Sequence, residues 1–242
     1  MKGRGIPLVV FCAVLWLAFL VPGLKAGEDL LEQGLAAQKA GKQEQAVELL
    51  GKYLEQQPDS VEARRARARA LAALGRNTEA LAQVELGLAR NPKNVPLLLV
   101  RGSILAELDR RNDAIAAYSQ VITLDPKNAN AFKERGENYA HENRFQEAMK
   151  DFNQAATLAP KDPWVFNKRG IAWFCQGEYQ KAVADFSTAI RLGPDLPHAY
   201  FFRGNIYRHH LGQEKKAVAD YQKACKLGHP LACQELEKLG AK

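Results

Sequence analysis

Residues 163–196 read PWVFNKRGIAWFCQGEYQKAVADFSTAIRLGPDL, and residues 129–162 read ANAFKERGENYAHENRFQEAMKDFNQAATLAPKD. Both segments place apolar or small residues at positions 4, 8, 11, 17, 20, 24 and 27, then leucine at position 30 and proline at position 32. Within each half the spacing is three or four residues, which is typical of an amphipathic helix. A turn-forming residue separates the halves, Asn143 in one and Gly177 in the other. Each segment is therefore predicted to form two short antiparallel helices.

The same pattern divides most of the chain into units of 34 residues, a period typical of stacked repeats. Proline is excluded from helix interiors, and it recurs at this interval: Pro58, Pro92, Pro126, Pro160 and Pro194. The six predicted units are 27–60, 61–94, 95–128, 129–162, 163–196 and 197–230. The sixth unit carries one extra residue, so the alanine that corresponds to position 20 of the other units is Ala217. Residues 231–242 are expected to form a capping helix, over 231–239, and a tail.

Two positions of the unit hold small residues, which let helices approach closely. Position 8 holds Gly34, Ala68, Gly102, Gly136, Gly170 and Gly204, and position 20 holds Ala46, Ala80, Ala114, Ala148 and Ala182. On these residues the chain resembles the tetratricopeptide repeat family from residue 27 to about residue 230. The resemblance implies an all-α fold: an α-α superhelical solenoid of about six helix pairs plus a C-terminal capping helix.

The first 26 residues differ from the repeats. Two basic residues precede an apolar run over residues 6–21, and Ala26 offers a small residue for cleavage. This pattern is typical of a secretory signal peptide over residues 1–26. The run is also near the ~17-residue lower limit for spanning a bilayer, so the alternative is an uncleaved inner-membrane anchor formed by residues 6–24. In either case we expect the rest of the chain to be exported, to the periplasm or outside the cell.

The composition argues against nucleic-acid binding and against catalysis. The net charge is +7, but beyond residue 26 the chain holds 31 basic and 27 acidic residues, too small an excess for a nucleic-acid-binding field. The sequence has no phosphate-binding glycine loop, nucleophile elbow or paired-carboxylate motif. Cys175, His141 and His209 share one position of successive units, but helices ~8–10 Å apart cannot place them ~2.0–2.3 Å from one zinc ion. We expect no enzyme activity, metal or cofactor.

Arginine recurs at position 7 of units two to six, and aspartate recurs at position 23 of the last three. We predict structural ion pairs within these three units: Arg135–Asp151, Arg169–Asp185 and Arg203–Asp220. As partly exposed pairs, they are expected to contribute ~0–1 kcal/mol each.

Cys225 and Cys233 lie on either side of a Gly-His-Pro turn. On one continuous helix their Cα atoms would lie ~12 Å apart, but the turn lets them face each other across two helices. The stretch resembles the cysteine-containing Sel-like repeats of exported bacterial proteins, and this resemblance implies a disulfide. Two buried free thiols are the alternative.

The resemblance to tetratricopeptide repeats also implies that the first helix of each pair lines a concave groove. The residues mapped onto this partner-binding groove are Lys133, Glu137, Trp164, Asn167, Lys168, Ile171, Phe174, Phe201, Asn205 and Arg208. The three aromatic residues among them are expected to anchor a partner. The basic and amide groups partly match the carboxylate clamp of chaperone-binding family members, so they are expected to hold an acidic group. The alternative is that the rings pack on neighbouring helices and the groove is unoccupied.

A second basic face is predicted on Arg65 and Arg69, which are four residues apart on one helix. It could bind acidic protein segments, or it could be a solvated helix surface.

The chain is therefore expected to be a non-catalytic scaffold or adaptor that binds a protein or peptide segment, with membrane contact only through an uncleaved N-terminal segment. Two alternatives are an envelope-assembly or secretion accessory with a chaperone-like holding role, and recognition of cell-wall glycan or peptide.

Overall fold

The computed structural model describes residues 22–240, which contain thirteen α-helices and no strand. They belong to two compact units that divide between Gln83 and Val84. Most of the predicted leader, residues 1–21, lies outside the described residues. Between residues 22 and 240, no helix is both long enough and apolar enough to cross a membrane.

The first unit contains three complete helices, α1 (Pro22–Lys39), α2 (Gln43–Gln56) and α3 (Val61–Ala73). The division falls within α4 (Asn77–Arg90). Helix α1 begins before Gly27, where the first repeat was expected to open, and the predicted cleavage point after Ala26 therefore lies within this helix. Helix α2 packs on α1 and α3, and α1 also contacts α3.

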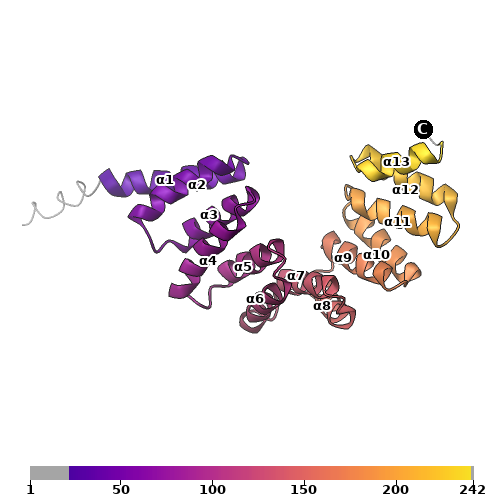
Figure 1. Ribbon diagram of the computed structural model, residues 1–242, viewed down its shortest axis with the longest axis horizontal. Helices are drawn as coiled ribbons and strands as arrows, with labels where there is room; N and C mark the ends of the chain where they lie inside the picture. Colours follow the sequence, from indigo (N-terminus) through magenta and orange to yellow (C-terminus); the bar gives the residue numbers. More distant parts are fainter. Residues whose placement is uncertain (1–21, 241–242) are drawn as a thin grey trace, which may run out of the picture. The chain divides into compact units, whose positions relative to one another are not determined.

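The second compact unit, which begins at Val84, consists mainly of pairs of neighbouring helices (Figure 1). They are α5 (Val95–Glu107), α6 (Arg111–Leu124), α7 (Ala129–His141), α8 (Phe145–Leu158), α9 (Pro163–Cys175), α10 (Tyr179–Leu192), α11 (Pro197–His209), α12 (Glu214–Lys226) and α13 (Pro230–Lys238). Helices α3, α5, α7, α9 and α11 begin at the residues that open predicted units two to six. Helix α7 contacts both α5 and α9, so first helices of successive units lie against one another.

Local chemistry explains where these helices begin. The side chains of Asn94, Asn128 and Asp162 precede α5, α7 and α9 and accept hydrogen bonds from backbone N–H groups of the first turn. Such N-caps satisfy donors that have no partner within the helix. The turns inside the pairs are equally specific. Asp109 and Asn143 both have φ of 59°, a left-handed conformation that aspartate and asparagine tolerate better than most residues.

The glycines at position 8 of units three to six sit under large rings of the second helix. A Cβ atom added to Gly102 would lie 2.6 Å from Cζ of Tyr118, and one added to Gly136 would lie 3.0 Å from Cε1 of Phe152. Both rings are buried, at 2% and 1% exposure, so neither has open space beside it to move into. The glycines therefore let the two helices of a pair approach until the rings fill the core.

The last repeat departs from this regular pattern. The connection between α11 and α12 covers residues 210–213, and Gly212 in it has a φ of 63°. The capping helix α13 covers Pro230–Lys238, one residue earlier at each end than expected. It packs on α12, with Ala232 and Leu236 in the shared core.

Candidate functional site

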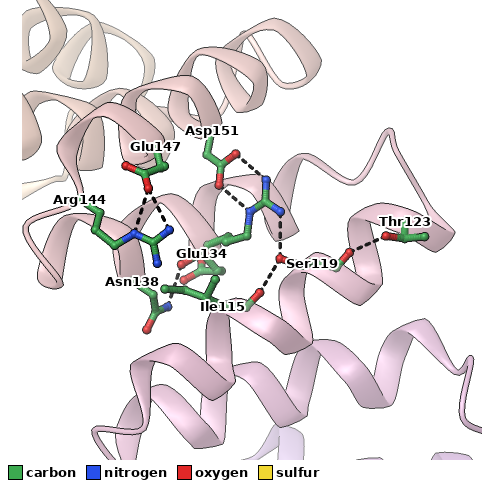
Figure 2. A network of polar contacts seen from close by, with 9 residues as sticks. Ile115, Ser119, Thr123, Glu134, Asn138, Arg144, Glu147 and Asp151 are labelled. Atoms are coloured by element: carbon green, nitrogen blue, oxygen red, sulfur yellow. Dashed lines mark hydrogen bonds and ion pairs between the residues drawn. The ribbon is translucent and has the colours of Figure 1, made fainter.

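Three arginines join the helices of successive repeats. Each makes two hydrogen bonds to the predicted aspartate, with N–O distances of 2.7–2.8 Å. Each also donates to a residue on the preceding repeat's second helix: Arg135 to Ser119, Arg169 to Asn153 and Arg203 to Ser187. Figure 2 shows Asp151 and Ser119 facing the same guanidinium.

These pairs are more buried than the sequence suggested. The three aspartates are only 4–6% exposed. Loss of an arginine would therefore leave a buried carboxylate without its cation, which costs more than loss of a surface ion pair. The arginines are structural staples and are not presented to a ligand.

The lysines predicted to hold an acidic partner already contact carboxylates. Lys133 Nζ lies 3.3 Å from Asp162 and 3.7 Å from Glu134. Lys168 bridges Glu134, at 3.7 Å, and Glu137. Burial raises the pKa of Glu134, the two lysines oppose that shift, and Glu137 adds to it. An incoming carboxylate would have to compete with these groups, so the structure does not present a free clamp.

The other polar residues of the predicted clamp are also engaged or buried. Asn205 accepts a hydrogen bond from the Tyr221 hydroxyl at 2.8 Å, and Arg208 pairs with Glu235 on the capping helix. Asn167 is 5% exposed, and its Oδ1 accepts no hydrogen bond from any residue between 22 and 240.

The three predicted aromatic anchors differ in exposure. Trp164 is 48% exposed. Phe174 is half-buried among the rings of Tyr179, Phe202 and His210. Phe201 is also half-buried; it stacks on His229 with ring centroids 4.3 Å apart and lies beside Phe202 and Tyr221. Only Trp164 is thus presented as an open apolar surface, and the two phenylalanines mainly pack within the protein.

An apolar pocket of about 230 Å³ lies between α7 and α9. Its lining residues are Glu137, Ala140, His141, Phe145, Phe152, Lys168, Ile171, Ala172 and Cys175. Three of these, Glu137, Lys168 and Ile171, were predicted as groove residues. The pocket also brings Cys175 and His141 to one surface, although no cluster of three or more potential metal ligands occurs in the described part of the chain.

A polar pocket of about 320 Å³ lies between α5 and α7. Its lining residues are Ala106, Glu107, Asp109, Arg111, Glu137, Asn138 and His141. Glu137 and His141 line both pockets, so the two are adjacent across α7. We refer to all the residues that line either pocket, taken together, as the two-pocket surface.

Arg65 and Arg69, the predicted second basic face, lie on α3 and form no ion pair with any residue from 22 to 240. Burial lowers the pKa of Arg69, and the nearby charge of Arg65 adds to that effect. Two like charges share one face of α3, which is compatible with an acidic ligand but equally with a solvated helix surface.

The two C-terminal cysteines form a disulfide. Cys225 on α12 and Cys233 on α13 have Cα atoms 4.8 Å apart, within the range of such bonds. Among the described residues, Cys175 is the free cysteine, and it is exposed. The bridge fixes the capping helix to the last repeat.

A protein-family model described as tetratricopeptide repeat matches residues 31–95, 99–163 and 169–229. The chain belongs to the tetratricopeptide repeat family. Its third match reaches beyond Cys225, and the resemblance of this end to Sel-like repeats is not supported. The fold of the family is consistent with protein–protein interaction, and its members are generally non-catalytic scaffolds.

Solved structures share this tetratricopeptide fold. The structure of pilF from Pseudomonas aeruginosa has a TM-score of 0.73 at 21% identity, over 88% of this chain and 97% of that one. A structure of MamA has a TM-score of 0.59 at 24% identity, over 68% and 96% of the two chains. MamA from Desulfovibrio magneticus RS-1 has a TM-score of 0.59 at 19% identity, over 68% and 92%. No curated protein sequence matches the chain. At these identities the likeness shows the fold alone.

Several residues of the repeat array were not anticipated from the sequence. Position 25 holds a side chain that can form hydrogen bonds in three successive units: Ser119, Asn153 and Ser187. This recurrence is the sequence feature that could have predicted their contacts with the arginines. Glu134 and Asp162 were overlooked beside the lysines they neutralise. Asn138 was overlooked because a single asparagine inside a helix has no distinctive sequence pattern.

Proposed function

We propose that this tetratricopeptide repeat protein is a non-catalytic scaffold that captures a segment of a partner protein on the two-pocket surface. The observation that carries the proposal is the apolar pocket between α7 and α9. Ile171, Ala140 and Ala172 give it an apolar lining, while Lys168 and Glu137 contribute charged groups. This combination suits an apolar side chain flanked by polar backbone.

An apolar side chain of the partner would provide most of the binding energy. Complete burial of a leucine- or methionine-sized side chain contributes about 1.5–3 kcal/mol. Trp164, which is on α9 and 48% exposed, offers a further apolar contact on that helix. The predicted anchors Phe174 and Phe201 line neither pocket, and they pack mainly on other rings of the protein.

We place this activity outside the cytosol, in an exported compartment. The basic and apolar N-terminal sequence supports export. The disulfide between Cys225 and Cys233 supports it independently, because such bonds persist in oxidising compartments. Sequencing the N-terminus of the mature protein tests cleavage: a start at Gly27 would support a signal peptide, and a start at Met1 or Lys2 would support the anchor.

Recognition of cell-wall glycan is the second candidate. It is favoured by one observation, the exposed ring of Trp164, which could stack on a sugar. Chaperone-like holding of an assembling envelope protein would use the same pockets as the scaffold function, so the identity of the captured partner separates those two.

Site-specific photo-crosslinking in cells tests the proposal. A benzoylphenylalanine replaces Cys175, which is exposed and lines the apolar pocket. The matched control replaces Thr157, which is exposed on α8 and lines neither pocket. We expect a discrete protein adduct from position 175 and none from position 157. Equal adducts from both positions, or none from position 175, would refute the scaffold site, and an adduct with murein alone would favour the glycan alternative.

A further inference from the structure

We propose that the polar pocket between α5 and α7 binds an arginine or lysine side chain of the partner segment whose apolar side chain occupies the neighbouring pocket. This inference rests on the proposed scaffold function and specifies the chemistry of the partner. It reverses the sequence-based expectation of an acidic partner at this part of the array.

The charge of the polar pocket favours a cation. Arg111 lies 2.9 Å from Asp109 and 4.0 Å from Glu142, so its charge is already shared between two carboxylates. Glu107 is exposed at the end of α5 and forms no ion pair with any residue from 22 to 240. Three carboxylates and one arginine line the pocket: Glu107, Asp109, Glu137 and Arg111. One further carboxylate, Glu142, contacts Arg111, and one further cation, Lys168, contacts Glu137. The group as a whole therefore holds four carboxylates and two cations.

A buried acceptor in the pocket wall also lacks a donor. Asn138 is 3% exposed, and its amide nitrogen donates to the backbone oxygen of Glu134 at 2.8 Å. Its Oδ1 accepts no hydrogen bond from the described chain, and Figure 2 shows this oxygen turned away from Glu134. Buried amide oxygens are normally satisfied. A guanidinium or ammonium group supplies donors only, and therefore complements both the carboxylates and this oxygen.

The spacing of the pockets predicts a spacing in the partner. The polar pocket lies between α5 and α7, and the apolar pocket lies between α7 and α9, with Glu137 and His141 common to both. Neighbouring helices lie ~8–10 Å apart. An extended segment rises ~3.3 Å per residue, so about three residues would separate its basic and apolar side chains.

Selection from a random peptide library displayed on phage, with the full chain as bait, tests this pattern. We expect enriched peptides to carry an arginine or lysine about three positions from a large apolar residue. Glu107→Lys reverses a charge at an exposed, unpaired position, and should weaken binding of an enriched synthetic peptide about fivefold or more at low salt. Glu237→Lys is the matched control, because Glu237 is exposed on α13, outside both pockets, and should leave the affinity unchanged.

The outcomes separate this inference from the scaffold function. Enriched peptides without a basic residue, the absence of any enriched peptide, or equal binding to wild type and Glu107→Lys would overturn the inference. A protein adduct from position 175 together with such a result would leave the scaffold function standing. Self-association of the chain that Glu107→Lys abolishes would also overturn it, because the occupant would then be a second copy.

Discussion

Replacement of Arg135 by methionine should destabilise the repeat array strongly. The change removes two hydrogen bonds to Asp151, at 2.7 and 2.8 Å, and one to Ser119 at 3.0 Å. The Asp151 side chain is 6% exposed, so its carboxylate would remain buried without a cation. Removal of one member of a buried pair costs about 3–5 kcal/mol. Because Arg135 is 18% exposed and water can partly replace it, we expect about 3 kcal/mol.

Thermal unfolding followed by circular dichroism measures this loss. For a protein of this size 1 kcal/mol corresponds to about 2–4 °C, so Arg135→Met should lower the melting temperature by roughly 6–12 °C. Arg144→Met is the matched control, since Arg144 pairs with Glu147 at 2.8 Å but both side chains are more than 40% exposed. Such a pair contributes about 0–1 kcal/mol. The double variant Arg135→Met/Asp151→Leu should recover most of the loss, because no charge remains buried. Equal effects of the two single variants, or no recovery in the double variant, would refute the staple account.

Three further changes probe other parts of the array. Replacing Cys225 and Cys233 by serine should lower the free energy of unfolding by about 2.5 kcal/mol, because the bridge closes a loop of 8 residues. It should also accelerate hydrogen exchange in α13, and unchanged exchange would show that the bridge does not hold this helix in place. Gly102→Leu should lower the free energy of unfolding, measured in urea, by at least about 2 kcal/mol. The reason is that even the Cβ atom of the new side chain would lie 2.6 Å from the buried Tyr118 ring. An unchanged urea midpoint would show that the ring can move. Burial lowers the pKa of His229, so on acidification the unfolded state takes up the proton before the folded state does. The free energy of unfolding should therefore fall as the pH drops below about 6.5. Urea unfolding at several pH values should show a smaller fall for His229→Phe, and identical pH profiles of the variant and the wild type would contradict this assignment.

The helical architecture could be read from the sequence because several local signals agree. Proline at the end of each unit, turn residues between the helices and small residues at position 8 all mark the same register. Helices α9 and α11 therefore begin at Pro163 and Pro197 as predicted. The capping helix was also located to within one residue, because Gly228 and Pro230 interrupt the preceding helix.

The candidate site was less predictable because it depends on contacts between repeats. A mapped register identifies Lys133 and Lys168 as residues of one face, but it does not show that Glu134 lies 3.7 Å from both. Likewise, a phenylalanine such as Phe201 has the same sequence signature whether it faces solvent or stacks on His229. Pockets form from the side chains of three helices, and no single repeat encodes them.

Filling the apolar pocket tests most directly whether a partner binds there. Ala140 lines the pocket near the end of α7, so Ala140→Trp would occupy the space that a partner side chain requires. The measurement is the affinity of the partner cross-linked from position 175, with the melting temperature of the variant as a control for folding. We predict a loss of about 1.5–3 kcal/mol, or at least about tenfold, in a variant that remains folded at the assay temperature. Equal affinity of the variant and the wild type would contradict the account.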